Sequence, residues 1–186
     1  MISGPVILLL GPSGSGKSYH AQQISLARPA ILALNAGELL RQSFKTTKEQ
    51  LRTASGAAIQ ENQSELSEAL SRARVGRWSR PVLLEAHTFI DNDRELVDIP
   101  AESIAALEPK GILSIDEPAE IISERRRRDK RRRPERSLDE IEHQRKKSCA
   151  LAETYAEKLR IPLLSVRSDD FGNSLRFLDE LMTAYP

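Results

Sequence analysis

The segment GPSGSGKS (11–18) fits at every position the pattern G-x-x-x-x-G-K-[ST], which cradles the phosphates of nucleotides. It follows the apolar run PVILLL (5–10) and opens a helical stretch, as this P-loop motif requires. Its glycines allow successive backbone N–H groups to surround phosphate oxygens. We predict an ATP site in which Lys17 reaches the β- and γ-phosphates and Ser18 ligates Mg²⁺. The residues assigned to nucleotide binding are Gly11, Ser13, Gly14, Ser15, Gly16, Lys17, Ser18 and Tyr19.

The acceptor must be sought at the carboxyl ends of the other strands, where ligands of parallel sheets gather. Glu85 and His87 lie at the end of the apolar run PVLLEA (81–86). We predict Glu85 as the carboxylate of the magnesium sphere or of the attacking group. His87 is expected to orient the acceptor, although purely structural roles remain open for both residues. Asp116 is expected to cap the helix that follows it rather than to touch a ligand.

The segment SERRRRDKRRRPERS (123–137) packs nine basic side chains into fifteen positions. On a helix, Arg125, Arg128 and Arg132 lie near one face, at spacings of three and four. Guanidinium groups closing over phosphate stabilise the charge that phosphoryl transfer spreads over the equatorial oxygens. We predict a lid in which Arg125 contacts the nucleotide, Arg128 and Arg132 act in catalysis, and the other charges stay solvated or paired.

Composition limits the alternatives for this basic run, which are a solvated surface and a nucleic-acid-binding segment. The 28 Lys and Arg residues nearly balance 27 Asp and Glu, and the net charge is +1. The pI of about 7.9 is below the value of about 9 that is typical of nucleic-acid-binding domains. No stretch approaches the roughly 20 apolar residues of a membrane span, and the N-terminus lacks a basic signal-peptide region. We therefore expect a cytoplasmic protein without membrane contact, in which nucleic-acid binding is the less favoured reading.

The chain alternates short apolar runs with helical stretches. Five runs predict strands at 5–10, 30–34, 81–86, 111–115 and 161–166. None of them alternates polar with apolar residues, which indicates strands buried on both faces of a parallel sheet. The chain length of 186 residues suits a single domain, so the pattern predicts one α/β domain.

Helix ends are marked by caps and prolines. Thr47 and Gln50 have capping-box spacing and predict the start of a long helix, which Gly76 ends. Ser137 and Glu140 form a second such box. Other helices are expected over 15–27, from Pro118 to Pro134, and near the C-terminus; the lone Cys149 is expected to be a small core residue on the helix that Ser137 starts.

The order of the motifs resembles that of archaeal-type adenylate kinases, a family of P-loop nucleoside monophosphate kinases. Besides the P-loop, the resemblance rests on NAGELL (35–40), KEQLR (48–52), LLEAH (83–87), DIP (98–100), LEPKGILSIDEPAEI (107–121) and RRRRDKRRR (125–133). It covers roughly residues 5–182. It implies a three-layer P-loop kinase fold whose five-stranded parallel sheet has the order 2-3-1-4-5. It also implies a single domain over residues 1–186, with an acceptor-binding helical region at about 36–76 and the lid at about 123–137.

The resemblance further implies residues for the acceptor site. Arg52 matches an arginine that holds the monophosphate, and Lys48 stands where the family has another. His87 matches the histidine after the third strand, and Gly37 belongs to the glycine-acid pair after the second. Arg41 is similar to an arginine of bacterial-type enzymes; it could bind the acceptor phosphate or lie on the exposed face of its helix.

The leading hypothesis is phosphoryl transfer from ATP to a nucleoside monophosphate, with AMP favoured: ATP + AMP ⇌ 2 ADP. Three departures from the family weaken the AMP assignment: Glu85 replaces an aspartate, Ala86 replaces a threonine, and Pro134 falls where a lid residue would bind. A kinase of another small acceptor, such as a nucleoside or a hydroxyl-bearing metabolite, is the first alternative. A P-loop ATPase whose basic segment binds nucleic acid, and a nucleotide-binding protein without catalysis, are the others.

Overall fold

A parallel sheet of five strands, in the order β2-β3-β1-β6-β7, forms the centre of the computed structural model, which describes residues 3–129 and 135–185. Its neighbouring strands all pair in parallel. Numbered within this sheet alone, the order is 2-3-1-4-5, so the predicted α/β P-loop kinase fold is confirmed. The strands are β1 (Val6–Leu10), β2 (Leu32–Asn35), β3 (Val82–Glu85), β6 (Pro109–Ile115) and β7 (Leu163–Val166).

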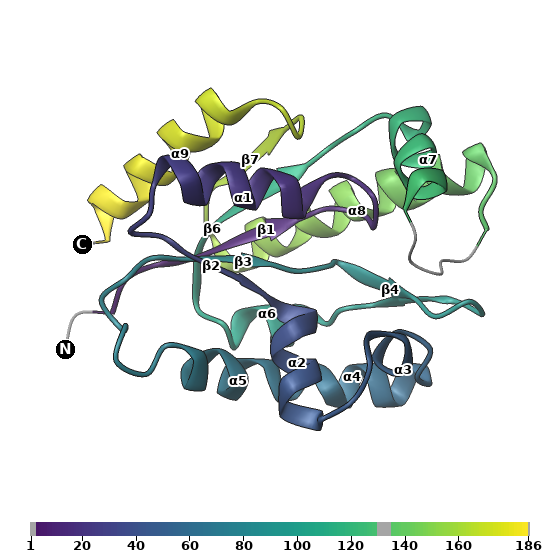
Figure 1. The fold of residues 1–186 in the computed structure, drawn as a ribbon, viewed down its shortest axis with the longest axis horizontal. Coiled ribbons are helices and arrows are strands. Elements are labelled where there is room, and N and C mark those ends of the chain that lie inside the picture. The colour runs from purple at the N-terminus through teal and green to yellow at the C-terminus, as the bar shows by residue number, and fades with distance from the viewer. Residues whose placement is uncertain (1–2, 130–134, 186) are drawn as a thin grey trace.

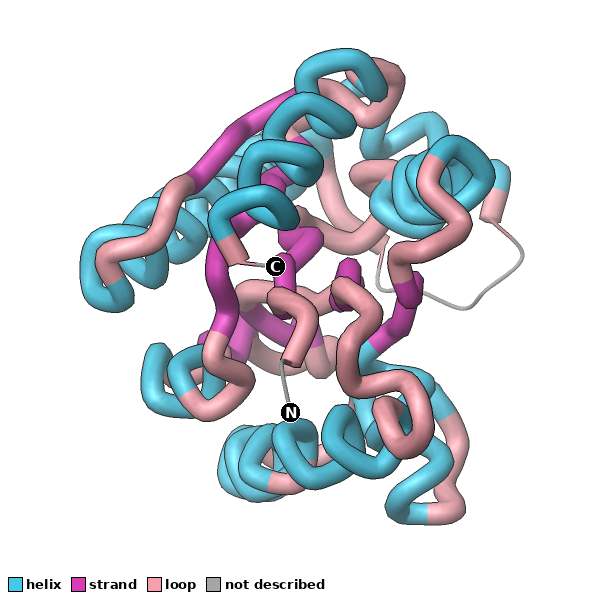
Figure 2. Tube along the Cα trace, turned by 90° about the vertical axis from the view of Figure 1, so that its left-hand side faces the viewer, coloured by secondary structure: helices cyan, strands magenta, loops and turns pink. Residues whose placement is uncertain are grey.

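Helices cover both faces of the sheet and make a three-layer structure (Figures 1 and 2). Because successive side chains of a strand point to opposite faces, β1 contributes to two cores. Ile7 and Leu9 pack with α1 (Lys17–Ala27) and α9 (Phe171–Ala184). Leu8 packs in the larger core on the other face. The helices on that face are α2 (Ala36–Phe44), α4 (Gly56–Ser64), α5 (Leu66–Ala73), α6 (Ala101–Ala105) and α8 (Leu138–Leu159).

The helical region after β2 differs from the prediction of one long helix up to Gly76. It contains α3 (Lys48–Arg52), α4 and α5 as separate short helices. The predicted capping box of Thr47 and Gln50 is present, but Ser55 caps a new helix by accepting a hydrogen bond from the Ala58 N–H at 3.3 Å. A strong N-cap inside an apolar repeat therefore interrupts a helix that periodicity alone would continue.

A two-stranded antiparallel hairpin, β4 (Phe89–Asp91) and β5 (Leu96–Asp98), lies between β3 and β6 and was not predicted from the sequence. Its strands have three residues each, too few for a periodic pattern to be recognised. The hairpin begins two residues after His87, so it forms part of the surroundings of the predicted acceptor site.

The helix α7 (Ala119–Arg128) carries the first part of the basic run. Its predicted end at Pro134 lies outside the described residues. The prediction that Asp116 caps this helix is wrong, because Pro118 is the N-cap and the Asp116 carboxylate instead accepts a hydrogen bond from Arg145 at 2.6 Å. The predicted capping box of α8 is present, and Cys149 lies partly buried on that helix, where burial raises the pKa of its thiol to about 11.

Tyr155 of α8 fastens the hairpin segment to the core. Its side chain is fully buried, and its hydroxyl lies 2.6 Å from the carbonyl oxygen of Ile99 and 3.2 Å from that of Thr88. We expect Tyr155→Phe to lower the free energy of unfolding by about 1–2 kcal/mol, since the buried carbonyl of Ile99 loses this donor. Urea denaturation measures this difference.

The matched control is Tyr185→Phe, which removes the same hydroxyl from a ring that is 41% exposed. An equal loss of unfolding free energy in the two variants would contradict the role given to Tyr155.

None of the helices in the described part of the chain is both long and apolar enough to cross a bilayer.

Candidate active site

The P-loop joins β1 to α1 through three glycines with positive φ. Gly11, Gly14 and Gly16 have φ of 144°, 88° and 98°, a region that other residues adopt only with strain. A Cβ on Gly14 would lie 2.9 Å from the side chain of Arg126, and one on Gly16 would lie 2.7 Å from that of Arg125. These two glycines therefore permit both the turn and the close approach of α7.

Lys17, the predicted phosphate-binding lysine, is buried at the start of α1. Its Nζ donates hydrogen bonds to the carbonyl oxygens of Gly11 at 2.7 Å and Pro12 at 3.0 Å. The Nδ1 atom of His87 lies 3.5 Å from the same ammonium. The structure thus brings the predicted phosphate-binding lysine beside the predicted acceptor-orienting histidine.

Ser18 and Glu85, the two residues predicted to hold magnesium, are in direct contact. The Ser18 hydroxyl donates to the Glu85 carboxylate, whose oxygens lie 2.9 and 3.0 Å away. Glu85 ends β3, which pairs in parallel with β1, so the sheet register sets it next to the helix that the P-loop opens. A hydroxyl and a carboxylate are oxygen ligands of the kind that Mg²⁺ takes alongside nucleotide phosphates, so this pair fits the ion. The extra methylene of glutamate does not keep it away from Ser18.

Two consecutive arginines of α7 bind the backbone of the P-loop. Arg125 donates from Nη1 to the carbonyl oxygen of Ser15 at 2.7 Å. Arg126 donates from Nε to the carbonyl oxygen of Ser13 at 2.9 Å. The start of the basic run therefore lies over the loop, and Arg126, which sequence spacing had not singled out, is one of the two residues that reach it.

Arg128, predicted to be catalytic, is not brought to the P-loop. Its side chain is 78% exposed and forms an ion pair with Glu124 on the same helix. Three residues after Arg125, it lies about 4.5 Å further along the helix axis, where it is exposed to solvent. Arg132, the other predicted catalytic arginine, lies outside the described residues.

Two cavities adjoin the P-loop. The first, here the P-loop cavity, has a volume of ≈ 230 Å³. The second, here the Arg52 cavity, has a volume of ≈ 90 Å³. Ser13 and His87 line both of them. The P-loop cavity is also lined by Gly14, Gly16, Lys17, Ser18, Tyr19, Glu85, Arg125 and Asp129. The Arg52 cavity is also lined by Arg52, Phe89, Ile90, Asp91, Arg126 and Gln144.

Arg52, one of the predicted acceptor residues, lines the second cavity. Its guanidinium donates to the carboxylates of Asp93 at 2.6 Å and Glu49 at 2.8 Å, and to the carbonyl oxygen of Asp91 at 3.1 Å. These contacts hold the side chain against the β4–β5 hairpin, where it lines the same cavity as His87. Two of the predicted acceptor residues, Arg52 and His87, are therefore brought together.

The other predicted acceptor residues line neither cavity. Arg41 forms an ion pair with Glu38 within α2, and this guanidinium lowers the pKa of the Glu38 carboxyl to about 2. Gly37 lies in the first turn of the same helix, and Lys48 is exposed at the start of α3. In this structure, Gly37, Arg41 and Lys48 thus stand apart from the cavity that Arg52 and His87 share.

A polar network that sequence analysis missed closes the Arg52 cavity. The Asp91 carboxylate accepts hydrogen bonds from Arg136 and from the Gln144 amide, both at 2.9 Å. Gln144, which is only 3% exposed, also accepts a hydrogen bond from Arg126 at 2.8 Å. The hairpin, α8 and α7 therefore meet at one buried amide. The signal in the sequence was a glutamine on the side of α8 that carries Ile141 and Ser148, both of which are buried.

The sequence profile of the AAA domain family matches residues 10–144, well over half of the chain, and this match includes the P-loop, both cavities and α7. The chain belongs to the AAA domain family. Among curated proteins, no sequence matches it significantly.

Solved structures similar to this AAA domain include two shikimate kinases. One, from Acinetobacter baumannii in complex with shikimate, has a TM-score of 0.61 and 16% sequence identity, over 97% of this chain and 92% of that chain. The other, from Aquifex aeolicus, has a TM-score of 0.55 and 19% identity, over 96% of each chain. At these identities the likeness establishes the P-loop kinase fold.

A buried acid connects α7 to the loop after β7. Glu117 is 3% exposed and accepts a hydrogen bond from the Ser168 N–H at 2.8 Å. It also lies 3.6 Å from Arg125 and 3.2 Å from Arg167. Arg125 is thereby held between the P-loop and this acid. Sequence analysis named the neighbouring Asp116 and missed Glu117, although both follow a buried strand.

Tyr19 and His20 follow the P-loop on α1 and face the loop after β7. Tyr19, predicted to bind nucleotide, is 54% exposed and makes an edge contact with Phe171. His20 is buried, stacks on Phe171 at 5.0 Å between ring centroids, and has its Nδ1 2.9 Å from the carbonyl oxygen of Ser168. These contacts fix the wall of the P-loop cavity on which Tyr19 lies.

Burial lowers the pKa of His20 below its ordinary value of 6.5, because the interior disfavours the charged ring. Below pH 6.5 the unfolded chain therefore binds more protons at this site than the folded chain, and folding stability falls as the pH decreases. We expect wild type to lose more unfolding free energy than His20→Gln between about pH 7.5 and about pH 5.5. Urea denaturation at both pH values measures the two losses.

The matched control is His143→Gln, on α8, which removes a histidine that is not fully buried. Its pH dependence should follow wild type. Equal pH dependence in wild type and His20→Gln would contradict the assignment.

Proposed function

We propose that this AAA domain transfers the γ-phosphoryl group of ATP to a nucleoside monophosphate, with AMP as the preferred acceptor. One observation carries the proposal: the P-loop cavity and the Arg52 cavity share Ser13 and His87. A donor phosphate on the P-loop and an acceptor beside Arg52 would then face each other across a common wall. Phosphoryl transfer depends on holding donor and acceptor in line, so this placement supports a kinase.

The roles of the residues follow from their positions. Lys17 would bind the β- and γ-phosphates from the centre of the loop. Ser18 and Glu85 would hold Mg²⁺, which neutralises phosphate charge when bound. Arg125 and Arg126, which already lie on the loop, would stabilise the charge that develops on the equatorial oxygens.

The acceptor proposal rests on Arg52. Its two carboxylate partners, Glu49 and Asp93, are each 46% exposed, so an incoming phosphate can replace these ion pairs at small cost. The resemblance to archaeal-type adenylate kinases supports AMP as the source of that phosphate. We also propose that residues 1–186 form one kinase domain, in which about 36–76 bind the acceptor and about 123–137 form the lid.

A second candidate is a kinase of a smaller, hydroxyl-bearing acceptor. The Arg52 cavity has a volume of only ≈ 90 Å³, and the solved structure from Acinetobacter baumannii holds shikimate. An acceptor of this kind needs less space than a nucleotide and makes Arg52 dispensable if it carries no anionic group.

The test is ADP formation from Mg-ATP with AMP, CMP, GMP, UMP, the corresponding nucleosides and shikimate offered separately, against a blank without acceptor. We expect AMP to give the highest kcat/KM. Arg52→Ala should raise the KM for AMP by about tenfold or more, because a charge-assisted bond to phosphate is lost. The KM for ATP should stay unchanged.

Arg72→Ala is the matched control, because Arg72 pairs with Glu68 on the exposed side of α5 and lines neither cavity. Turnover of shikimate in preference to AMP, or turnover of a nucleoside with an unchanged KM in Arg52→Ala, would favour the second candidate. ADP formed equally in the blank would indicate an ATPase and contradict both.

A further inference from the structure

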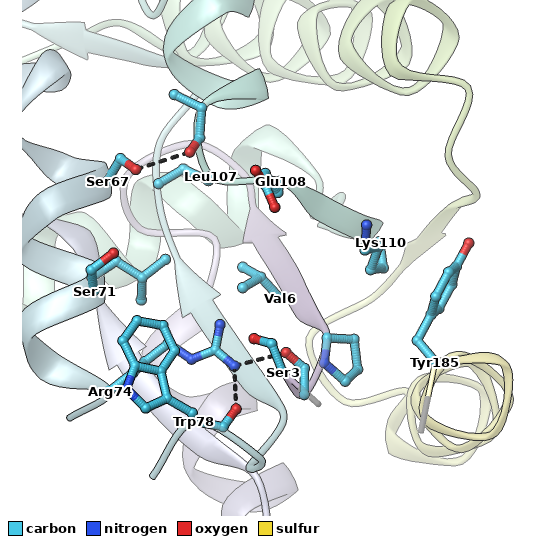
Figure 3. A pocket seen from close by; sticks show the side chains of 14 residues that line it. Ser3, Val6, Ser67, Ser71, Arg74, Trp78, Leu107, Glu108, Lys110 and Tyr185 are labelled. Atoms are coloured by element: carbon cyan, nitrogen blue, oxygen red, sulfur yellow. Dashed lines mark hydrogen bonds between the residues drawn. The ribbon is translucent and has the colours of Figure 1, made fainter. Parts of the chain in front are cut away.

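A separate cavity, here the distal cavity, opens at the amino ends of the strands (Figure 3). Its volume is ≈ 450 Å³, and its walls include Gly4, Val6, Arg74, Trp78, Lys110 and Tyr185. The five residues of β1 separate this end of the sheet from the P-loop by roughly 15 Å. None of its lining residues lines the P-loop cavity or the Arg52 cavity. The distal cavity is therefore independent of the proposed active site.

Arg74, at the end of α5, is the central feature of this cavity. Its side chain is buried, at 5% exposure, and its Nη2 donates to the carbonyl oxygens of Gly4 at 2.8 Å and Trp78 at 2.7 Å. Its Nε is buried and has no hydrogen-bond partner among the described residues. Figure 3 shows the guanidinium among the side chains that surround the cavity. Part of its hydrogen-bonding capacity is thus unused.

The charge of Arg74 is also uncompensated by acid. Within residues 3–129 and 135–185 it forms no ion pair, whereas Arg52 and Arg136 each pair with a carboxylate. A buried charge without a counter-charge is unfavourable, and burial lowers the pKa of this guanidinium. An anion in the distal cavity would supply the missing partner.

The other charges of the distal cavity favour an anion as well. Lys110 lines it, with Nζ 5.5 Å from the centre of the Tyr185 ring. Glu108 is the one acidic side chain among its lining residues. With two cationic side chains and one acidic side chain, the lining of the cavity has a net positive charge.

Two aromatic side chains supply flat apolar surface. Trp78 and Tyr185 lie on different sides of the cavity (Figure 3), and they are 36% and 41% exposed. The Trp78 ring also lies 5.2 Å from the Arg74 guanidinium. Exposed rings beside a cation suit a ligand that combines a flat ring with negative charge.

We propose that the distal cavity binds a small organic anion, a flat ring that carries a phosphate or carboxylate group. The acidic group pairs with Arg74 and Lys110, and the ring lies against Trp78 or Tyr185. This site is separate from the proposed kinase reaction and does not depend on it.

Trp78 is the single tryptophan of the chain, so intrinsic fluorescence reports directly on this cavity. The probes are phenyl phosphate and benzoate, which carry both features, with inorganic phosphate and uncharged benzamide as single-feature controls. We expect a saturable change in Trp78 emission with phenyl phosphate or benzoate, and weaker binding of both controls. No saturable change with either two-feature probe, or benzamide binding as tightly as benzoate, would overturn the proposal.

Two variants locate the binding. Lys110→Gln should raise the dissociation constant of the better probe by about fivefold, whereas Lys158→Gln, the same change on the exposed side of α8, should leave it unchanged. Arg74→Gln should abolish binding; Lys110→Gln keeps the test decisive if Arg74→Gln fails to fold. Lys17→Ala should bind the probe as wild type does. Equal dissociation constants for Lys110→Gln and Lys158→Gln, or loss of the signal in Lys17→Ala, would contradict the assignment to the distal cavity.

Discussion

Lys17→Ala should lower kcat for ADP formation by about 10²- to 10³-fold, because it removes the cation closest to the transferring phosphoryl group. The Lys17 ammonium is held by the carbonyl oxygens of Gly11 and Pro12, so its position is set by the loop before ATP binds. Preorganised charge of this kind acts without reorganisation during the reaction, which is why its loss is severe. The measurement is the steady-state rate with saturating Mg-ATP and the best acceptor.

Lys158→Ala, on the exposed side of α8, is the matched control and should keep the wild-type rate. Retention of more than about a tenth of the wild-type kcat in Lys17→Ala would show that the P-loop does not bind the transferring phosphate in the proposed way.

Arg126→Ala should lower kcat by about 10²-fold, whereas Arg128→Ala should stay within about twofold of wild type. Arg126 donates to the P-loop at Ser13 and to Gln144 in the Arg52 cavity, so it lies between the two places proposed for donor and acceptor. Arg128 is exposed and pairs only within its own helix in the described part of the chain. The two variants delete the same side chain from one helix, two residues apart, which makes each the control for the other.

The melting temperature of each variant should be measured together with its rate, because Arg126 also stabilises the contact of α7 with the loop. A reduced rate with a wild-type melting temperature supports a role in transfer. If Arg128→Ala lost as much activity as Arg126→Ala, α7 would have to move so that Arg128 reaches the phosphates, and the face predicted for Arg125, Arg128 and Arg132 would be the active one.

The P-loop and the sheet could be predicted because their signals are local. The motif at 11–18 specifies a backbone conformation through its own glycines, and the five apolar runs lie at the five strands of the sheet. The strand order could be predicted only from the family resemblance, since an apolar run does not indicate which strand will pair with it. The contact of Ser18 with Glu85 then follows from the parallel pairing of β1 with β3.

The residues that sequence analysis missed depend on contacts between distant parts of the chain. Gln144 reads as one polar position on a long helix until the fold sets it against Asp91. Glu117 reads as one half of an acidic pair until Ser168 and Arg167 close around it. Neither spacing nor composition carries this information.

The choice among arginines shows the limit of helical periodicity. Spacing grouped Arg125 with Arg128, because both lie near one face of α7. Of these two residues, only Arg125 contacts the P-loop. The second contact comes from the neighbouring Arg126, which lies outside the predicted face. Which arginines of α7 contact the P-loop depends on how far the loop extends along the helix, and this is a property of the folded chain.

We propose that the γ-phosphoryl group of ATP passes to an acceptor held beside the P-loop, and following the labelled γ-phosphate of ATP in the presence of AMP tests this most directly. We expect the label to appear in the β-phosphate of newly formed ADP, at a rate that depends on AMP and is lost in Lys17→Ala. Label released as inorganic phosphate at the same rate with and without AMP would contradict it.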